Sequence, residues 1–332
     1  MAPPRSLPPG LLIQTGQWVW RSLWLVMMGQ MAPRDRNGAY QRPPSQFRHS
    51  LGDAQGNYPA EPGRYRLLVG WGCPWAHRTL VMRVLKGLES TIAVTPVVPR
   101  PEAGGWAFVE PFQDCTTLPQ AYQKAQPGYS GRCTVPVLWD DRRQEIVNNE
   151  SAEILVMLND RCNDFAAHPQ ADFYPPDLRP AIDTWNEKIY HRVNNGVYRC
   201  GFAQTQAAYD RAVEELFSQL DDLDRHLQTQ RYLLGDRLTL ADIRLFPTLF
   251  RFDLVYHSLF KCSRQRIQDY PALGPYLRDL YQLPGIAATC HPQQIQQDYF
   301  GNLFPLNPGG ILPALPRCPD LTQPHHRDTL SP

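Results

Sequence analysis

The sequence predicts an α/β domain followed by an all-α domain, with extended arms at both ends of the chain. Three observations support this prediction. Between residues 64 and 165 the patterns follow the order strand, helix, strand and then strand, strand, helix. From about residue 180 the strand patterns fade, and apolar residues recur at helical spacing instead. Proline accounts for 33 of the 332 residues, about twice its usual ~5%, and much of it lies toward the two ends.

The N-terminal arm is expected over residues 1–63, because repeated prolines there prevent long regular elements. Its most apolar stretch, residues 18–28, is interrupted by Arg21 and is shorter than the ~20 apolar residues that a bilayer requires. We therefore expect no membrane span. We interpret the stretch as an amphipathic helix packed on the body of the protein, with an interfacial membrane helix as the alternative.

The α/β domain is expected over residues 64–165. A strand at 65–69 leads through the turn 70–72 into a helix that opens at Cys73 and Pro74. Proline suits the first helical position, where its missing N–H costs nothing. The other expected elements are strands at 92–98, 135–139 and 145–147, a helix at 152–158, and a short helix at 118–125 within an otherwise irregular stretch, 99–131. This order is that of a thioredoxin-like domain.

The all-helical domain is expected over residues 180–305. Thr239, followed by Asp242 three residues later, is a variant of the capping box and marks a helix start. Helical periodicity covers four stretches, at 182–194, 206–228, 241–252 and 273–281. Beyond them, prolines predict an extended C-terminal tail over residues 306–332.

Composition limits the classes of function. Hydrophobic residues make up 42% of the chain and charged residues 20%, which is enough apolar material for a core. The 33 basic and 32 acidic residues give a formal charge of +1, which provides no electrostatic footprint for nucleic acid. The 8 cysteines form no C-x-x-C pair and the 9 histidines lack metal-ligand spacing. We therefore expect no metal site and a reducing, cytoplasmic compartment.

Cys73 is the first candidate for chemistry. It lies between a strand and a helix, at or near the N-cap, where the helix dipole and free N–H groups lower a thiol pKa from ~8.5. The alternative is a buried, inert cysteine. Position 76 is Ala, so no second cysteine can resolve an internal disulfide, and a mixed disulfide at Cys73 would have to pass to an external thiol.

Two further segments are candidates for binding. If the Val135–Pro136 bond is cis, the backbone of Val135 can pair with an extended peptide, whereas a trans proline would only begin an edge strand. Glu150 and Ser151 precede a helix, where free N–H groups and a hydroxyl can hold a carboxylate. A plain helix cap is the alternative for this pair.

Nine ordered blocks of sequence stand out between residues 64 and 305: CPWAHR (73–78), LKGLE (85–89), GWAF (105–108), TVPVLWD (134–140), IVNNES (146–151), VNNGVY (193–198), GFA (201–203), RFDLVY (251–256) and DYP (269–271). With these blocks, residues 64–305 resemble the glutathionyl-hydroquinone reductases, also called the Xi class of glutathione transferases. The segments QFR (46–48), YPAE (58–61) and GRY (63–65) also look like the lead-in of that family.

The resemblance implies a glutathione-transferase fold, with a thioredoxin-like domain followed by a helical one, and a homodimer. It implies that Cys73 is the nucleophile, that Tyr198 is the proton donor, and that Tyr256 and Tyr299 lie near the thiol and help to lower its pKa. Glutathione serves as co-substrate and glutathionyl-hydroquinones as substrates. The residues that the resemblance assigns to glutathione binding are Trp106, Arg132, Cys133, Thr134, Val135, Glu150 and Ser151.

Elementary chemistry agrees with these assignments. The Glu150 carboxylate suits the α-ammonium of glutathione, and Ser151 with the helix N-terminus suits its α-carboxylate. The Val135 backbone can pair with the cysteinyl unit as a strand would. Tyrosine hydroxyls donate hydrogen bonds without adding charge, which favours a thiolate.

The chain departs from the family pattern at the turn before the nucleophile, where Gly70, Trp71 and Gly72 replace a small polar run. Cys133 and Cys200 flank binding segments and could be additional oxidisable sites. Two alternatives stay open. One is an omega-like thiol transferase or dehydroascorbate reductase that uses the same cysteine, and the other is a non-catalytic binding module with the same fold.

Overall fold

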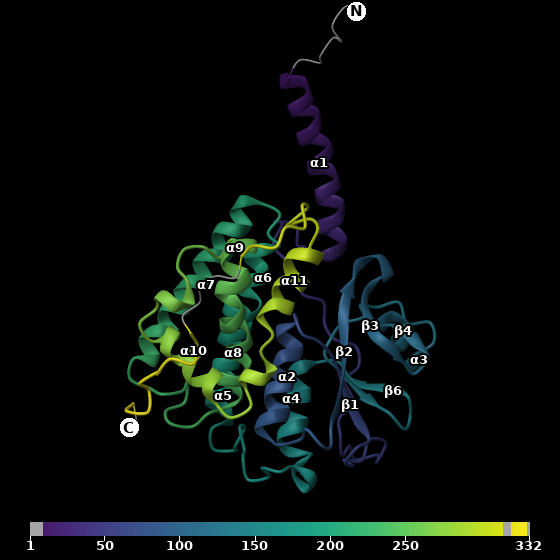
Figure 1. Cartoon of the computed structure of the whole chain (residues 1–332), viewed down its shortest axis with the longest axis vertical. Helices are drawn as coiled ribbons and strands as arrows, with labels where there is room; N and C mark the ends of the chain where they lie inside the picture. Colours follow the sequence, from purple (N-terminus) through teal and green to yellow (C-terminus); the bar gives the residue numbers. More distant parts are fainter. Residues whose placement is uncertain (1–8, 315–319, 331–332) are drawn as a thin grey trace, which may run out of the picture.

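The structure is a computed structural model that describes residues 9–314 and 320–330 (Figure 1). Its sheet has six strands in the order β4-β3-β2-β1-β5-β6. β1 pairs in parallel with β2, and the remaining neighbours pair antiparallel. The strands are β1 (Tyr65–Gly70), β2 (Ala93–Arg100), β3 (Gly105–Phe112), β4 (Cys115–Thr117), β5 (Val137–Asp140) and β6 (Glu145–Asn148).

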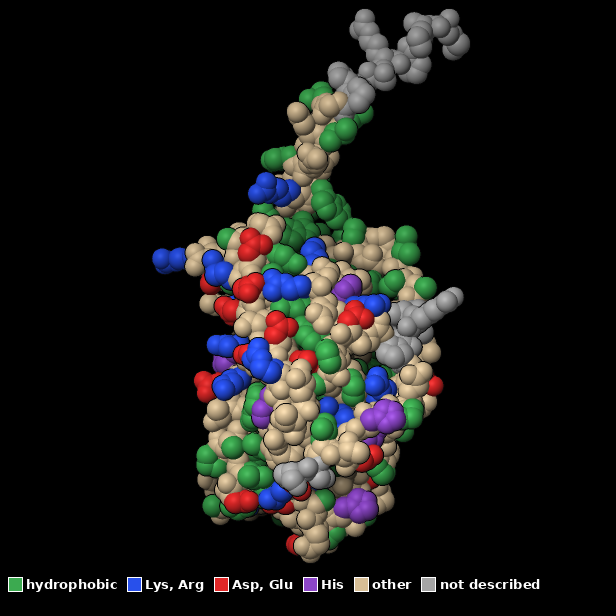
Figure 2. Space-filling view, turned by 90° about the vertical axis from the view of Figure 1, so that its left-hand side faces the viewer, with side chains coloured by type: hydrophobic (Ala, Val, Ile, Leu, Met, Phe, Trp, Pro, Cys, Tyr) green, Lys and Arg blue, Asp and Glu red, His purple; other side chains and the backbone are tan. Residues whose placement is uncertain are grey.

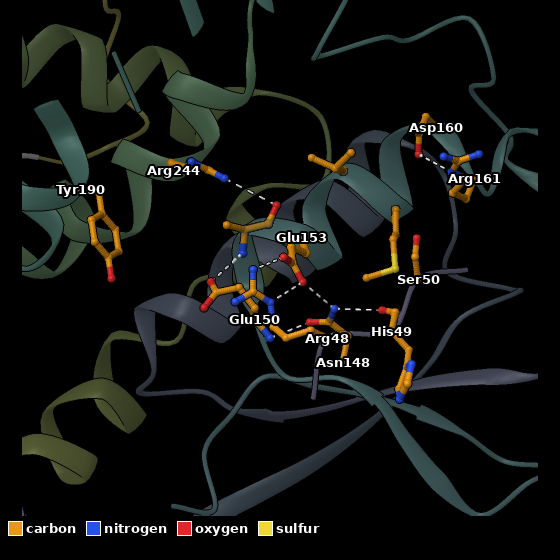
Figure 3. A pocket seen from close by; sticks show the side chains of 13 residues that line it. Arg48, His49, Ser50, Asn148, Glu150, Glu153, Asp160, Arg161, Tyr190 and Arg244 are labelled. Carbon is orange, nitrogen blue, oxygen red and sulfur yellow. Dashed lines mark hydrogen bonds and ion pairs between the residues drawn. The ribbon is translucent and has the colours of Figure 1, made fainter. Parts of the chain in front are cut away.

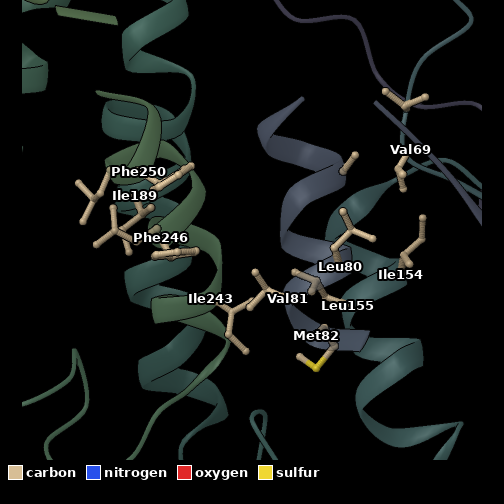
Figure 4. Packing of buried hydrophobic residues seen from close by; sticks show 14 of the residues in the cluster. Val69, Leu80, Val81, Met82, Ile154, Leu155, Ile189, Ile243, Phe246 and Phe250 are labelled. Atoms are coloured by element: carbon tan, nitrogen blue, oxygen red, sulfur yellow. The ribbon is translucent and has the colours of Figure 1, made fainter. Parts of the chain in front are cut away.

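Two helices cover the face of the sheet that meets the helical domain, α2 (Pro74–Leu85) and α4 (Ser151–Asp160). A third, α3 (Leu118–Ala125), packs beside β3, β4 and β6 and begins with a complete capping box at Thr117. α2 is nearly surrounded, because it contacts both α4 and α8 (Leu240–Arg251). Figure 4 shows Val81 of α2 facing Ile243 of α8, so one hydrophobic core runs through both halves of the molecule.

The second half is helical, as the sequence predicts. Besides α8, its helices are α5 (Arg179–Ile189), α6 (Gly196–Gly201), α7 (Gln206–Leu227), α9 (His257–Leu259), α10 (Leu273–Gln282) and α11 (Pro292–Asn302). Two π-helical turns, Tyr190–Asn194 and Phe252–Tyr256, follow α5 and α8. The short 3₁₀ turns are Pro101–Ala103, Asn163–Phe165, Ile267–Asp269 and Ala287–Thr289. The predicted helix start at Thr239 is confirmed, since the Asp242 carboxylate accepts hydrogen bonds from its N–H and hydroxyl, both at 2.9 Å.

The expectation of an irregular stretch over 99–131 is wrong outside the short helix, because β3 and β4 lie there. β3 pairs with β2, with Phe108 opposite Val97. Its burial does not alternate along the strand, and its register with β4 shifts, so no period of two appears in the sequence. The sequence also missed α6 and α11. The first is short, and the second has few apolar residues among its glutamines.

The N-terminal helix α1 (Pro9–Met31) is longer than expected and does not pack along the body, which corrects that expectation. Trp18 is 71% exposed and Leu12 53%. Only the end of the helix is anchored: Met28 is buried, and Trp24 Nε1 donates to the carbonyl of Pro305 at 3.1 Å. Hydrophobic side chains therefore line a helix that projects from the molecule (Figures 1 and 2). Among the described helices, none combines the length and apolar content needed to cross a membrane.

The rest of the N-terminal arm returns to the sheet. Arg48 forms a bridge with Asn148 at the end of β6, and the N–H of His49 donates to the carbonyl of Val147 at 3.0 Å. This segment therefore extends the β6 edge rather than standing apart. At the other end, Arg327 is buried and donates to carbonyls of the helical domain. The ends of both predicted arms, residues 1–8, 315–319 and 331–332, lie outside the described residues, as does Cys318.

Candidate active site

Cys73 is the N-cap residue of α2, with extended backbone angles (φ −77°, ψ 118°), and Pro74 occupies the first helical position. Its side chain is half-buried. The thiol donates to the carbonyl of Val135 at 3.5 Å, and the Val135–Pro136 bond is cis. The structure thus brings together the first and second sequence candidates, which are 62 positions apart in the chain.

The pKa of the Cys73 thiol differs from the sequence expectation. Burial at the junction of the two domains raises this pKa above its ordinary value. The backbone N–H groups of Ala76 and Trp75 at the helix N-terminus oppose the rise, as do the guanidinium groups of Arg42 and Arg251. The helix dipole argument is therefore sound in direction, but desolvation outweighs it in the free protein.

Trp106 lies on β3 opposite Pro99 of β2 and covers the turn before Cys73. A Cβ atom at Gly70 would lie 2.4 Å from the Trp106 ring, so this position has room only for glycine. The departure from the family pattern at Gly70 is thereby explained, because the glycine lets the indole approach the turn.

The segment 132–135 is anchored by two tyrosines. Tyr122 donates to the carbonyl of Thr134 at 2.8 Å and accepts from its N–H at 3.2 Å, while Tyr129 donates to the carbonyl of Arg132 at 3.0 Å. Within the segment, burial raises the pKa of Cys133 to about 11. The Cys133 thiol is therefore less ionised than an ordinary cysteine, and its role as an additional oxidisable site stays a prediction.

Glu150 is the N-cap of α4. Its carboxylate accepts from the N–H of Ala152 at 3.1 Å and from the hydroxyl of Ser45 in the N-terminal arm at 3.0 Å. Ser151, the first residue of the helix, is buried. Glu150 therefore caps α4, as the plain helix-cap alternative predicts. Ser45 of the N-terminal arm also holds the Glu150 carboxylate in place.

A cavity of about 620 Å³ lies beside Glu150 and reaches Tyr190 and Arg244 of the helical domain (Figure 3). Within it Glu153 is bound by Arg48 at 2.7 Å and by the amide of Asn148 at 2.8 Å. Arg244 donates to the carbonyl of Ala152 at 3.5 Å. Glu150 is the member that this cavity shares with the predicted glutathione-binding residues.

The three tyrosines that the resemblance selected meet within the helical domain. Tyr198 of α6 and Tyr299 of α11 place their hydroxyl oxygens 2.5 Å apart, and those of Tyr299 and Tyr256 are 3.1 Å apart. Burial raises the pKa of Tyr198 and Tyr299 well above the ordinary value and that of Tyr256 to about 12. A negative charge on Cys73 contributes to the rise at Tyr198 and Tyr256, which places these hydroxyls near the thiol.

That Tyr256 and Tyr299 help to lower the thiol pKa stays a prediction. Their hydroxyls bond to one another, that of Tyr299 also bonds to Tyr198, and burial is the largest influence on the pKa of Cys73. All three are neutral phenols near neutral pH. The cluster is therefore suited to donate a proton rather than to act as a base.

Sequence reasoning missed three charged groups at the site, namely Arg42, Arg251 and Asp298. Arg42 comes from the arm, and its guanidinium lies 4.1 Å from the ring centre of Trp75. Arg251 opens the RFDLVY block, which was the available signal for it. Asp298 directly precedes Tyr299 in a segment of weak periodicity. Within residues 9–314 and 320–330, no group of three or more metal-ligating side chains is assembled.

A thiol at the N-terminus of a helix in a thioredoxin-like domain, facing a helical domain, defines a protein of the glutathione S-transferase class. The model of the glutathione S-transferase N-terminal domain matches residues 72–161, and that of the C-terminal domain matches residues 206–279.

Full-length relatives narrow the class. Glutathionyl-hydroquinone reductase PcpF of Sphingobium chlorophenolicum is 44% identical over 317 residues, which is 93% of this chain and 97% of the relative. Glutathionyl-hydroquinone reductase YqjG of Escherichia coli K12 is 45% identical over 325 residues, again 93% of this chain and 97% of the relative.

Solved structures agree. The glutathione-bound structure of YqjG has a TM-score of 0.80 at 47% identity, covering 85% of this chain and 96% of that one. The Xi glutathione-S-transferase of Phanerochaete chrysosporium has a TM-score of 0.82 at 43% identity, covering 85% and 94%. The chain therefore belongs to the glutathionyl-hydroquinone reductases, the Xi class of glutathione transferases, and the resemblance and the fold class predicted from the sequence are confirmed.

Proposed function

We propose that this chain reduces glutathionyl-hydroquinones to hydroquinones through a mixed disulfide between Cys73 and glutathione. The observation that supports the proposal is the Cys73 thiol at the N-terminus of α2, bonded to the Val135 carbonyl, together with the hydrogen-bonded three-tyrosine cluster. A thiol and a proton donor are the two groups that cleavage of a carbon–sulfur bond requires. The activity named for PcpF and YqjG supports the same reaction.

In the first step the Cys73 thiolate attacks the sulfur of the glutathionyl group. A sulfur–sulfur bond forms, the bond from sulfur to the ring carbon breaks, and the electron pair leaves with the carbon. The carbon takes a proton from the hydroxyl of Tyr198, which releases the hydroquinone. Tyr299 can stabilise the resulting phenolate through its hydrogen bond to Tyr198.

In the second step a free glutathione thiolate attacks the mixed disulfide. Cys73 leaves as a thiolate, glutathione disulfide is released, and the proton from the second glutathione restores Tyr198. The two sulfurs are oxidised by two electrons in total, and the ring carbon is reduced by the same two. Glutathione is consumed as a co-substrate, and no metal enters either step.

The glutathionyl group is held, in this proposal, mainly by the thioredoxin-like wall. The Glu150 carboxylate takes the α-ammonium, Ser151 and the free N–H groups of α4 take the α-carboxylate, and the Val135 backbone pairs with the cysteinyl unit. Trp106 covers the ligand beside Gly70. Residues 132–134 form the rim of this cradle.

We propose in addition that the protein acts in the cytoplasm as a homodimer. Family likeness supports the dimer. The cytoplasm is supported by the cysteines, because all seven within the described residues are free thiols.

The direct test is turnover of a glutathionyl-hydroquinone by the full chain and by Cys73→Ala. We expect Cys73→Ala to lose at least about a thousandfold in rate, because the nucleophile is gone. Cys115→Ala, which removes a buried thiol on the edge strand β4, is the matched control and should keep wild-type turnover. Wild-type turnover by Cys73→Ala would rule out the mechanism, and no turnover by the unaltered chain would favour the binding-module alternative.

A further inference from the structure

Two buried side chains of opposite charge form hydrogen bonds to the turn before Cys73, one to its N–H group and the other to its carbonyls. The N–H of Gly72 donates to Asp298 Oδ2 at 2.9 Å. From the other side, Arg251 Nε donates to the carbonyl of Gly72 at 2.8 Å and Nη2 donates to the carbonyl of Trp71 at 2.9 Å. Every hydrogen-bonding group of the Gly72 residue is therefore held by a charged side chain of the helical domain.

Arg251 is completely buried, and Asp298 is 7% exposed. Burying charges is costly unless their hydrogen bonds are satisfied. Here Arg251 also donates to the carbonyl of Pro247 at 3.1 Å, and its charge opposes the rise that burial causes in the pKa of Asp298. A fold that retains such a pair behind its nucleophile gains a fixed position for the turn.

His77, one helical turn after Cys73, completes the arrangement. Its Nδ1 lies 2.8 Å from Arg251 Nη1, and its Nε2 lies 2.9 Å from the hydroxyl of Thr289. Burial and the neighbouring Arg251 charge lower the pKa of His77 well below its usual value. The ring is therefore neutral, with Nδ1 accepting from the guanidinium and Nε2–H donating to Thr289, which in turn donates to the carbonyl of Ile286 at 2.7 Å.

Gly72 is required by this geometry. A Cβ atom there would lie 2.5 Å from Asp298 Oδ2 and 2.6 Å from its Cβ. The Gly70-Trp71-Gly72 turn, where the chain departs from the family pattern, thus has glycine on both sides for two different reasons. Gly70 admits Trp106, and Gly72 admits Asp298.

We propose that Arg251 and Asp298 are positioning residues for Cys73, holding the preceding turn so that the thiol stands at the N-terminus of α2 and faces Val135. Only the expected effect of this positioning on turnover rests on the proposed function. The positioning itself is a property of the free protein. Because Arg251 ends α8, directly before the turn that carries Tyr256, and Asp298 precedes Tyr299 on α11, the same two segments fix both the thiol and the tyrosines.

The test measures the pH dependence of iodoacetamide alkylation at Cys73, read from the mass of the peptide that contains it, in the full chain. In Arg251→Met the nearby positive charge and the grip on the turn are lost. We expect the pH of half-maximal rate to rise by about one unit, which is roughly a tenfold slower reaction at a fixed pH below it. Turnover should fall at least as far.

Arg327→Met is the matched control. Arg327 is also a buried arginine that donates to backbone carbonyls, but those carbonyls belong to Leu227, Gln230 and Arg231, away from the thiol. We expect this variant to lose thermal stability and to keep the wild-type alkylation profile. An unchanged profile in Arg251→Met, or the same shift in Arg327→Met, would overturn the proposal.

Asp298→Asn keeps the inference testable if Arg251→Met does not fold. The amide oxygen can still accept from Gly72, but the negative charge that offsets Arg251 is gone. The pH of half-maximal alkylation should therefore move down, opposite to Arg251→Met, and a rise or no change would contradict the proposal. If the variants show these shifts but the unaltered chain does not turn over glutathionyl-hydroquinones, the proposed function alone is refuted.

Discussion

The two domains contribute two walls to the proposed site, and the walls are built from different kinds of groups. Besides the side chains of Cys73, Trp106 and Glu150, the thioredoxin-like wall contributes mainly backbone: the N–H groups that open α2 and α4, the Val135 carbonyl, and a turn whose glycines allow close approach. The helical wall presents side chains, with three tyrosine hydroxyls and the Arg251 guanidinium. Backbone groups suit a ligand of constant structure, such as a peptide. Side chains supply the proton and the charge.

The two walls also differ in how far apart in the sequence their groups lie. The groups of the first wall follow directly from short local patterns, such as a Cys-Pro pair between a strand and a helix. The groups of the second wall come from residues 198, 251, 256, 298 and 299, and only packing brings them together. The comparison therefore predicts that changes in the helical wall alter chemistry, while changes in the thioredoxin-like wall, Cys73 apart, alter binding.

Tyr198→Phe tests the helical wall and, after Cys73→Ala, has the largest expected effect. Removing the proton donor should slow release of hydroquinone about a hundredfold, while disulfide exchange at Cys73, which places no proton on carbon, should keep its rate. Parallel assays with a glutathionyl-hydroquinone and a small disulfide measure the split. Tyr209→Phe is the control, because the Tyr209 hydroxyl donates to the carbonyl of Lys261 and not to the three-tyrosine cluster.

Equal losses in both assays for Tyr198→Phe would break the comparison, since the tyrosine would then act on the thiol rather than on the ring. Wild-type rates in both assays would show that Tyr198 is not the proton donor.

Glu150→Gln tests the binding wall. The variant keeps an oxygen to cap α4 but loses the charge that meets the α-ammonium, so KM for glutathione should rise about tenfold with kcat little changed. Glu153→Gln, on the same helix but bound to Arg48 and Asn148, should leave KM unaltered. Steady-state kinetics against glutathione concentration provide the measurement. A loss confined to kcat would place Glu150 in the chemistry and contradict the division between the walls.

His77→Gln tests the support behind both walls and has the smallest effect. The folded protein keeps His77 neutral. Below pH ~6.5, therefore, His77 binds a proton in the unfolded chain but not in the folded one. Stability should therefore fall on acidification, by up to about 1.4 kcal/mol per pH unit from this group. Glutamine can accept from Arg251 and donate to Thr289 without titrating, so urea unfolding of His77→Gln at several pH values should show a shallower dependence. An identical slope would show that His77 does not carry it.

The sequence predicted the local features well. The helix start at Cys73, the short helix at 118–125 and the helix caps at Thr239 and Glu150 each depend on neighbouring residues, and the structure has each of these elements. The tyrosines came only from family resemblance, because fifteen tyrosines offer no local criterion for choosing three.

What sequence patterns could not supply was tertiary context. β3 lacks alternating burial, the projecting face of α1 looks like a face that packs, and the thiol pKa depends on how deeply the second domain covers Cys73. Arg251 and Asp298 both hydrogen-bond to Gly72, and Gly72 lies 226 positions from Asp298 in the chain. No local motif spans that distance.

The most direct measurement is a single turnover without free glutathione. The full chain is mixed with a glutathionyl-hydroquinone, quenched, and analysed for released hydroquinone and for the mass of each cysteine-containing peptide. We expect one equivalent of hydroquinone per chain and a glutathione adduct on the Cys73 peptide alone. Release of hydroquinone with Cys73 unmodified, or an adduct on another cysteine, would contradict the mechanism.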